Sequence, residues 1–266
     1  MYENLLTEVK HGVGIITLNR PERHNAFDDV VIGELIAAVA AMQDDDAVRV
    51  LVISSTGKSF CAGADLHWMK RAAAYSAQQS LEDARQLAEM LRCLAQLDKP
   101  TVARVQGPAY GGGVGLVAAC DIAIATYEAQ FTLSEVKLGI VPAVISPHVI
   151  AAIGERHARR YMLTAERFAA AEAYRIGLVH EIVPDEASLD DAVGEIVDTL
   201  LGNGPMALAA CKQLIRAVAA KPIDATVIDD TAQRIAAIRA TDEAREGMNA
   251  FFGKRKPNWI AQRGDK

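Results

Sequence analysis

The chain has 266 residues, of which 51% are hydrophobic and 23% are charged. This composition is typical of a globular protein with one large domain, or one domain plus a small appendage. The formal net charge of −6 argues against a nucleic-acid partner, which would require a basic face. No apolar run approaches the roughly 20 residues that a membrane helix needs, and residues 1–10 lack the apolar core of a secretory signal. We therefore expect a cytoplasmic protein with no membrane partner.

The first part of the chain alternates apolar runs that are typical of strands with amphipathic stretches that are typical of helices. Residues 12–18 and 48–54 are short, rich in β-branched side chains and bounded by Gly, Pro or Asp, so we expect two strands. Between them, residues 28–43 carry apolar side chains at helical spacing, and Asp28 or Asp29 can cap the start of the helix. The order of strand, helix and strand indicates an α/β fold.

The same rhythm continues in the next part of the chain. Residues 77–97 have apolar side chains at three- and four-residue steps, which predicts a long helix with one broad apolar face. Further strands are predicted at residues 101–105 and 121–125. Residues 114–120 lie between these strands and can form a helix.

The last part of the chain changes character, because only helical patterns are left. They cover residues 189–201, 205–219 and 225–250. We therefore divide the chain into a core of mixed strands and helices, residues 1–195, and a helical C-terminal region, residues 196–266.

Neither the cysteines nor the histidines follow a metal-ligand pattern. No CxxC motif or Cys/His pair is present, and a chain of this size does not need disulfide bonds, so we expect reduced thiols and no metal. The residues concerned are Cys61, Cys93, Cys120, Cys211, His24, His67 and His148. With no histidine beside it in the sequence, Cys61 is expected to fill space and not to act as a nucleophile.

Three separated segments have the composition of a catalytic site. Residues 60–66 read Phe-Cys-Ala-Gly-Ala-Asp-Leu, residues 107–113 read Gly-Pro-Ala-Tyr-Gly-Gly-Gly, and residues 131–139 read Phe-Thr-Leu-Ser-Glu-Val-Lys-Leu-Gly. Each of the first two segments alone would indicate only a tight turn between a strand and a helix. Together, in this order and at this spacing, the three segments resemble the crotonase (enoyl-CoA hydratase/isomerase) superfamily.

The resemblance covers essentially the whole chain and implies a fold and a substrate class. The implied fold is a spiral of β-β-α turns with a helical C-terminal region that packs into a homotrimer, often a pair of stacked trimers. The implied substrate is an acyl-CoA thioester. No separate cofactor is expected, because coenzyme A is part of the substrate.

Water addition to a 2-enoyl thioester places negative charge on the thioester oxygen, which needs fixed hydrogen-bond donors. The loop that contains Ala64 leads into a predicted helix, so its amides can be left unpaired. The glycines at 111–113 allow a backbone to approach a ligand closely, and a helix over 114–120 would direct its positive end at the same oxygen. The resemblance assigns the two donors to the N–H groups of Ala64 and Gly112.

Glu135 is the candidate acid/base. In isolation, Ser134-Glu135 would indicate a helix cap and a first-turn carboxylate. Family members with two catalytic glutamates carry the first just after the triple glycine and the second 20 residues later. Here 135 − 115 = 20, but position 115 is glycine, so Glu135 stands alone. Apolar neighbours would raise its pKa and suit it to proton transfer near neutral pH.

One glutamate leaves the reaction open. It can take a proton from water as the water adds to Cβ and return that proton to Cα on the same face, which is a syn hydration. It can also move a proton between two carbons, as in the related enoyl-CoA isomerases. A catalytically silent acyl-CoA-binding subunit is a further alternative, against which the survival of both donor segments together with Glu135 argues.

Two stretches indicate the acyl group. Residues 102–116 and 141–147 resemble a branch of bacterial hydratases that act on methylglutaconyl-CoA in leucine breakdown or on longer isoprenoid relatives. The distal carboxylate of such a substrate requires a cation or several hydrogen-bond donors, because an unpaired buried charge is costly. The nearby cations are Lys70, Arg71 and Lys137. Arg71 is favoured, since a guanidinium can bind a carboxylate through two hydrogen bonds.

The resemblance also implies contacts with the rest of the substrate. A C-terminal lysine would reach the coenzyme A phosphates beside an aromatic side chain, although a solvated basic tail is the alternative. The loop near residue 23 would pass the nucleotide, and backbone atoms of the first donor segment would contact adenine. The residues expected to bind substrate or coenzyme A are Arg23, Ala62, Asp65, Leu66, Gly111, Gly115, Phe251 and Lys254.

Overall fold

The structure is a computed structural model that describes residues 2–260. Its main sheet has six strands in the order β1-β2-β3-β4-β6-β9, and a smaller sheet has the order β5-β7-β8. The strands are β1 (Leu5–Lys10), β2 (Val13–Leu18), β3 (Val50–Ser55), β4 (Thr101–Val105), β5 (Ala109–Tyr110), β6 (Ile122–Thr126), β7 (Gln130–Thr132), β8 (Phe168–Ala169) and β9 (Glu181–Val183). In the main sheet, β1 and β2 are antiparallel and every following pair is parallel.

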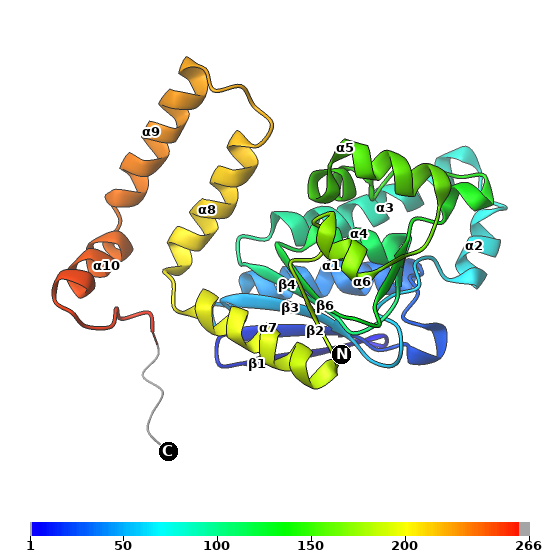
Figure 1. Cartoon of the computed structure of the whole chain (residues 1–266), viewed down its shortest axis with the longest axis horizontal. Helices are drawn as coiled ribbons and strands as arrows, with labels where there is room; N and C mark the ends of the chain where they lie inside the picture. The colour runs from blue at the N-terminus through cyan, green and yellow to red at the C-terminus, as the bar shows by residue number, and fades with distance from the viewer. Residues whose placement is uncertain (1, 261–266) are drawn as a thin grey trace.

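Helices follow most of the strands. The α-helices are α1 (Asp29–Asp44), α2 (Leu66–Ala72), α3 (Ala77–Gln96), α4 (Gly112–Ala119), α5 (Ser146–Thr164), α6 (Ala170–Arg175), α7 (Glu186–Leu201), α8 (Pro205–Val218), α9 (Ala225–Arg239) and α10 (Asp242–Phe252). Two short 3₁₀ helices are η1 (Pro21–Arg23) and η2 (Glu135–Leu138). Figure 1 shows α1, α3, α4 and α5 on one side of the main sheet and α7 on the other.

The core has the predicted spiral of β-β-α turns. In the clearest turn, β4 of the main sheet is followed by β5 of the small sheet and then by α4. The next turn runs from β6 to β7 and then to η2 and α5. An isolated parallel bridge between Cys61 and Ala109 brings the segment after β3 beside β5. Consecutive turns therefore place the three chemistry-bearing segments next to one another.

Alternate residues of β3 pack into separate apolar clusters. Leu51 and Ile53 belong to a large cluster that includes side chains of α1, α3 and α4. Val50 and Val52 pack with Leu189 and other residues of α7. All six residues of β3 are buried, which is expected for a central parallel strand covered on both faces. This rigid centre supports the loops at the carboxyl ends of β3 and β4.

The C-terminal helices form an arm that extends away from the core (Figure 1). No residue of α8 or α9 is buried, whereas α7 is packed on the sheet as far as Val197. The expected boundary at residue 195 therefore falls inside a core helix, and the arm begins after α7. One salt bridge, a 2.6 Å contact between Lys212 Nζ and Asp121 Oδ2, and several hydrogen bonds attach α8 to the core.

Most of the long predicted elements are confirmed, with the helix at 114–120 beginning two residues earlier, at Gly112. The helical pattern over 225–250 is interrupted, because Thr241 accepts a hydrogen bond from the backbone N–H of Ala244 and caps the start of α10.

All four cysteines are free thiols. No helix within residues 2–260 has both the length and the apolarity needed to cross a membrane.

Candidate active site

The first donor segment is held by a parallel bridge between Phe27 and Ala64. Phe27 N–H donates to the carbonyl of Gly63, and Asp65 N–H donates to the carbonyl of Phe27, each at 2.7 Å. In such a bridge the residue between the two bonded neighbours, here Ala64, directs its N–H away from the partner strand. Within the described chain, the Ala64 N–H has no hydrogen-bond acceptor.

The second donor segment is the start of α4. Gly111 has φ +48 and ψ −115, a conformation suited to glycine, and its N–H donates to the carbonyl of Thr132 at 2.9 Å. Val114 and Gly115 donate back to the carbonyl of Gly111. The N–H of Gly112 finds no acceptor among residues 2–260. It therefore belongs to the positive end of the helix.

The two donor segments touch. A Cβ atom at Gly63, where φ is +85, would lie 2.7 Å from the Tyr110 carbonyl oxygen and 3.5 Å from the Gly112 nitrogen. A Cβ atom at Gly112 would lie 4.0 Å from the Cα of Gly63. Only glycine at position 63 permits this approach without displacing the backbone. Two unpaired amides from separate turns of the spiral are therefore brought close together, as an oxyanion hole requires.

Glu135 lies beside this pair of segments. It lies in the first turn of η2, as the alternative interpretation expects, but Ser134 makes no side-chain capping bond, so the capping part of that interpretation is wrong. A Cβ atom at Gly111 would be 3.1 Å from Glu135 Oε1. Glu135 Oε2 is buried with no hydrogen-bond partner in the described chain. Burial raises the pKa of this carboxyl, as the sequence predicts.

Gly115 lies in α4 with no room for a side chain. A Cβ atom there would be 2.4 Å from Ile145 Cγ2, 2.8 Å from Ile145 Cβ and 3.5 Å from Leu91 Cδ1. Ile145 is 3% exposed and immediately precedes α5. The space of a second glutamate is therefore filled by an apolar side chain. Contact of Gly115 with substrate stays a prediction.

Ile145 lies in the stretch 141–147 that resembles the methylglutaconyl-CoA hydratases, but its contact with Gly115 was not predicted from the sequence. Its position lies 30 residues from Gly115 (145 − 115 = 30), and an isoleucine in a loop carries no pattern that indicates which residue it will face.

The residues that flank the first donor have different surroundings. Asp65 is 5% exposed and caps α2, where its Oδ1 accepts the backbone N–H groups of His67 and Trp68. Leu66 is 80% exposed at the start of that helix. Ala62 is half-buried, and its N–H donates to the carbonyl of His24. The structure thus gives Asp65 a structural role, and leaves Leu66 accessible for a ligand.

Arg23 is close to this group but Phe251 and Lys254 are not. Arg23 Nη1 lies 4.0 Å from Asp65 Oδ2, at the edge of the first donor segment. Phe251 is 78% exposed at the end of α10, and Lys254 is also exposed. In Figure 1, α10 and α2 lie on opposite sides of the molecule. One chain therefore does not assemble all of the expected coenzyme A contacts.

The expected receptor for a distal carboxylate is already occupied. Arg71 Nη2 contacts Asp29 Oδ1 at 2.5 Å, so the guanidinium connects α2 to the start of α1. Trp68 is 6% exposed, and its indole N–H donates to Asp83 Oδ1 at 3.0 Å. The structure therefore does not favour Arg71 over Lys70 or Lys137, whose side chains make no ion pair in the described chain.

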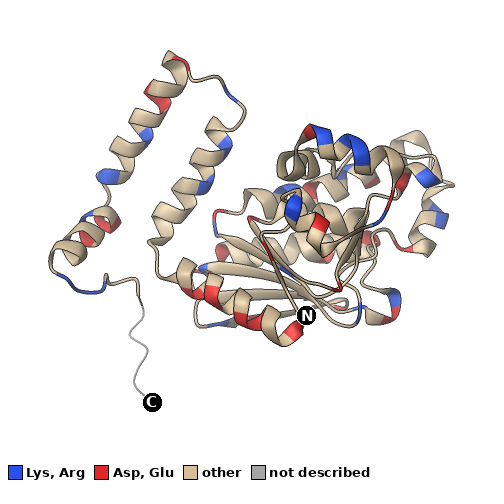
Figure 2. Cartoon of the chain, in the orientation of Figure 1, with Lys and Arg blue, Asp and Glu red and all other residues tan. Residues whose placement is uncertain are grey.

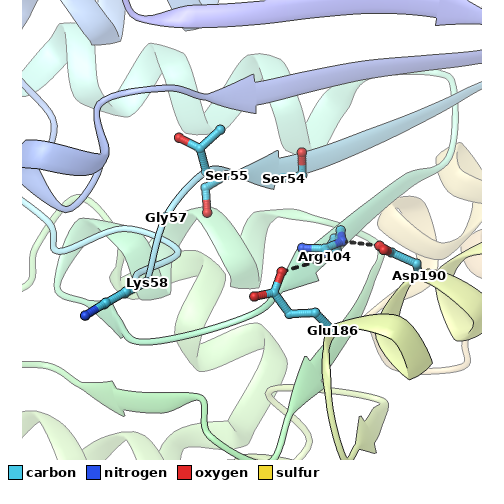
Figure 3. A pocket seen from close by; sticks show the side chains of 8 residues that line it. Ser54, Ser55, Gly57, Lys58, Arg104, Glu186 and Asp190 are labelled. Carbon is cyan, nitrogen blue, oxygen red and sulfur yellow. Dashed lines mark hydrogen bonds and ion pairs between the residues drawn. The ribbon is translucent and has the colours of Figure 1, made fainter.

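A surface cavity lies outside this cluster. Its volume is about 540 Å³, and Figure 3 shows it beside the end of β3, where Arg104 is joined to Glu186 and Asp190 of α7. None of the predicted site residues lines it. Figure 2 shows acidic residues along α7 and basic residues along α5. Among residues 2–260, no group of three or more His, Cys, Asp or Glu could hold a metal ion.

The fold and the paired donors define a class of acyl-CoA enzyme, and comparison with known proteins agrees. The model of the enoyl-CoA hydratase/isomerase family matches residues 8–262. The chain is 34% identical to a crotonyl-CoA hydratase of Syntrophomonas wolfei, over 98% of this chain and 99% of that protein. It is 31% identical to a 2,3-dehydroadipyl-CoA hydratase of Escherichia coli, over 96% and 98% respectively.

A solved structure of an enoyl-CoA hydratase from Shewanella pealeana superimposes with a TM-score of 0.95 at 44% identity, covering 97% of each chain. This chain belongs to the enoyl-CoA hydratase/isomerase family, whose members act on coenzyme A thioesters.

Proposed function

We propose that this enzyme adds water to a 2-enoyl-CoA thioester by syn addition, with Glu135 as the only proton carrier. The supporting observation is the position of the Glu135 carboxylate beside Gly111, next to the two unpaired amides of Ala64 and Gly112. The amides hold the enolate oxygen. The carboxylate takes a proton from the attacking water and returns it to Cα. The reaction needs no cofactor apart from the coenzyme A of the substrate.

The raised pKa of Glu135 supports this use of one carboxylate. A buried carboxyl is less acidic than usual, so it is a better proton acceptor when ionised and releases the proton less readily to bulk water. Its Oε2 atom is buried and has no protein partner in the described chain, so its capacity to accept a hydrogen bond is unused.

We propose 3-methylglutaconyl-CoA, from leucine or isoprenoid breakdown, as the substrate. The support is the resemblance of residues 141–147 to hydratases of that branch. The chain is also similar to a 2,3-dehydroadipyl-CoA hydratase, whose named acyl group, like 3-methylglutaconyl, ends in a second carboxyl. With Arg71 paired to Asp29, the distal carboxylate would be received by Lys70 or Lys137, or by a residue of a second copy.

The absorbance of the enoyl thioester tests both parts of the proposal. Purified enzyme is mixed with crotonyl-CoA, with 3-methylglutaconyl-CoA and with a 3-enoyl-CoA. Loss of the band with both 2-enoyl substrates, and a higher kcat/KM for 3-methylglutaconyl-CoA, is the expected result. A higher kcat/KM for crotonyl-CoA would contradict the proposed substrate.

Isomerisation is the second candidate, because a single glutamate can carry a proton between C2 and C4 of an enoyl chain. A gain of absorbance from the 3-enoyl-CoA, without loss from either 2-enoyl-CoA, would replace hydration by isomerisation. Binding of all three thioesters without any change would leave the silent-subunit alternative.

We further propose that the enzyme works in the cytoplasm as a homotrimer, or as a pair of trimers. The arm supports this assembly, since large apolar side chains on and between its helices are exposed. They are Met206, Ile215, Ile223, Ile228, Ile235, Met248, Phe251 and Phe252. In an assembly, Phe251 and Lys254 of one copy could complete the coenzyme A site of another.

Removing the end of the arm should weaken both assembly and substrate binding. For a chain that ends at Ala250, we expect sedimentation equilibrium to give an assembly with fewer copies of the chain. We also expect the Kd for an acyl-CoA to rise by at least about tenfold, equivalent to about 1.4 kcal/mol. A chain that ends at Ile260 is the control. An unchanged mass and Kd would show that the tail is only solvated surface.

A further inference from the structure

We infer that Arg20 positions the first oxyanion donor, although it contacts neither the donor amide nor the expected substrate. This inference rests on the proposed function of the Ala64 N–H. The side chain of Arg20 is 15% exposed and lies between the two segments of the Phe27–Ala64 bridge. Arg20 itself lies in the short connection between β2 and η1.

The bridge is followed on each side by an aspartate that caps a helix. Asp28 follows Phe27 and caps α1, with its Oδ1 accepting the N–H of Val31 at 2.9 Å. Asp65 follows Ala64 and caps α2, with its Oδ1 accepting the N–H of His67 at 2.8 Å. Each aspartate therefore uses one carboxylate oxygen for its helix and keeps the other free for a second partner.

Arg20 is that second partner for both aspartates. Its Nη1 lies 2.8 Å from Asp28 Oδ2, and its Nη2 lies 3.8 Å from Asp65 Oδ2. Nη1 also donates to the carbonyl of Ala26 at 3.0 Å. The Asp65 side chain is only 6% exposed, so loss of the guanidinium would leave a buried charge with one remaining ion pair, the 4.0 Å contact to Arg23.

One guanidinium nitrogen of Arg20 lies 2.8 Å from the Asp28 cap and the other forms a 3.8 Å ion pair with the Asp65 cap, so Arg20 opposes separation of the two caps and of the bridge between them. If the caps separate, the Phe27 carbonyl no longer holds Asp65 N–H, and the Ala64 amide turns away from Gly112. Such a displacement is small, but misplacement of a catalytic group by about 1 Å can cost about 10²-fold in rate. Lysine keeps the charge but cannot present two donors in one rigid plane.

The test compares Arg20→Lys with a matched control, Arg104→Lys. Arg104 is also 15% exposed and also joins two carboxylates, those of Asp190 and Glu186, but it lies against α7. Both variants are measured for thermal midpoint, kcat and the Kd of a saturated acyl-CoA. A fourth readout is the absorption maximum of a bound aryl-acryloyl-CoA, which moves to longer wavelength when hydrogen bonds polarise its thioester carbonyl.

For Arg20→Lys we expect a fall in kcat of about 10- to 100-fold and a smaller wavelength shift. Its thermal midpoint should fall no more than that of Arg104→Lys, which should keep both kcat and the wavelength shift. An unchanged wavelength shift in Arg20→Lys, or an equal loss of kcat in both variants, would overturn the inference. No turnover and no shift in the unaltered enzyme would instead overturn the proposed function on which it rests.

Discussion

Glu135→Gln should remove most turnover while the protein still folds and binds acyl-CoA. The substitution keeps the shape of the side chain but deletes the proton acceptor beside Gly111. General acid/base groups typically contribute ~10²–10⁴-fold to rate, and no second carboxylate is placed to compensate at Gly115. The measurement is kcat on the best 2-enoyl-CoA. Glu128→Gln, which changes an exposed glutamate on the turn after β6, is the control.

The difference in free energy of unfolding between Glu135→Gln and the unaltered enzyme should shift in favour of the variant as the pH rises. Burial raises the pKa of Glu135 above its value in the unfolded chain, so its contribution to stability is complete at low pH and is lost as pH rises through the folded pKa. The substituted glutamine side chain cannot ionise and avoids this loss.

The activity of the unaltered enzyme should change with pH in the opposite sense, because kcat/KM should fall as pH decreases through the raised pKa of Glu135. Near-normal turnover of Glu135→Gln would eliminate this residue as the base.

Gly115→Glu should destabilise the protein and should not create a two-carboxylate hydratase. The new Cβ would lie 2.4 Å from Ile145 Cγ2, and the carboxylate would be forced into a packed region. Overpacking alone typically costs about 1–3 kcal/mol, and a buried charge adds to it. Denaturant unfolding should show the loss, and activity on crotonyl-CoA should not rise.

Two further variants identify the cause of the expected loss of stability in Gly115→Glu. Gly115→Ala adds the Cβ without the charge, so it should show part of the loss. In the double variant Gly115→Glu with Ile145→Gly, the space is vacated, and the two changes should be strongly non-additive. A Gly115→Glu protein as stable as the unaltered enzyme would show that Ile145 does not define the single-carboxylate site.

The long elements of the fold could be predicted because their periodicity extends over many residues. The helix over 77–97 and the strand at 101–105 are examples. The strands β5 and β8 have two residues each, which is too short for any alternation to be visible. The interruption at Thr241 was missed because apolar spacing continues across the cap.

The site could be predicted in part, because some of its residues belong to local sequence motifs and others do not. Glycines 63 and 111 have the positive φ angles that their motifs indicate, and Glu135 lies beside them. Arg20 and Ile145 act through contacts with residues distant in sequence, and nothing in their neighbourhoods indicates those contacts. The positions of Phe251 and Lys254 depend on an arm on which many large apolar side chains are exposed.

The stereochemistry of hydration in D₂O tests the central claim most directly. If Glu135 takes a deuteron from water and returns it to Cα, the deuterium at C2 and the hydroxyl at C3 are added to the same face of crotonyl-CoA. The measurement is the proton NMR spectrum of the isolated 3-hydroxyacyl product. We expect one deuterium at C2 in the syn relation to the hydroxyl group. An anti product, or a product with deuterium randomly distributed over both C2 positions at early times, would contradict a single carboxylate acting on one face.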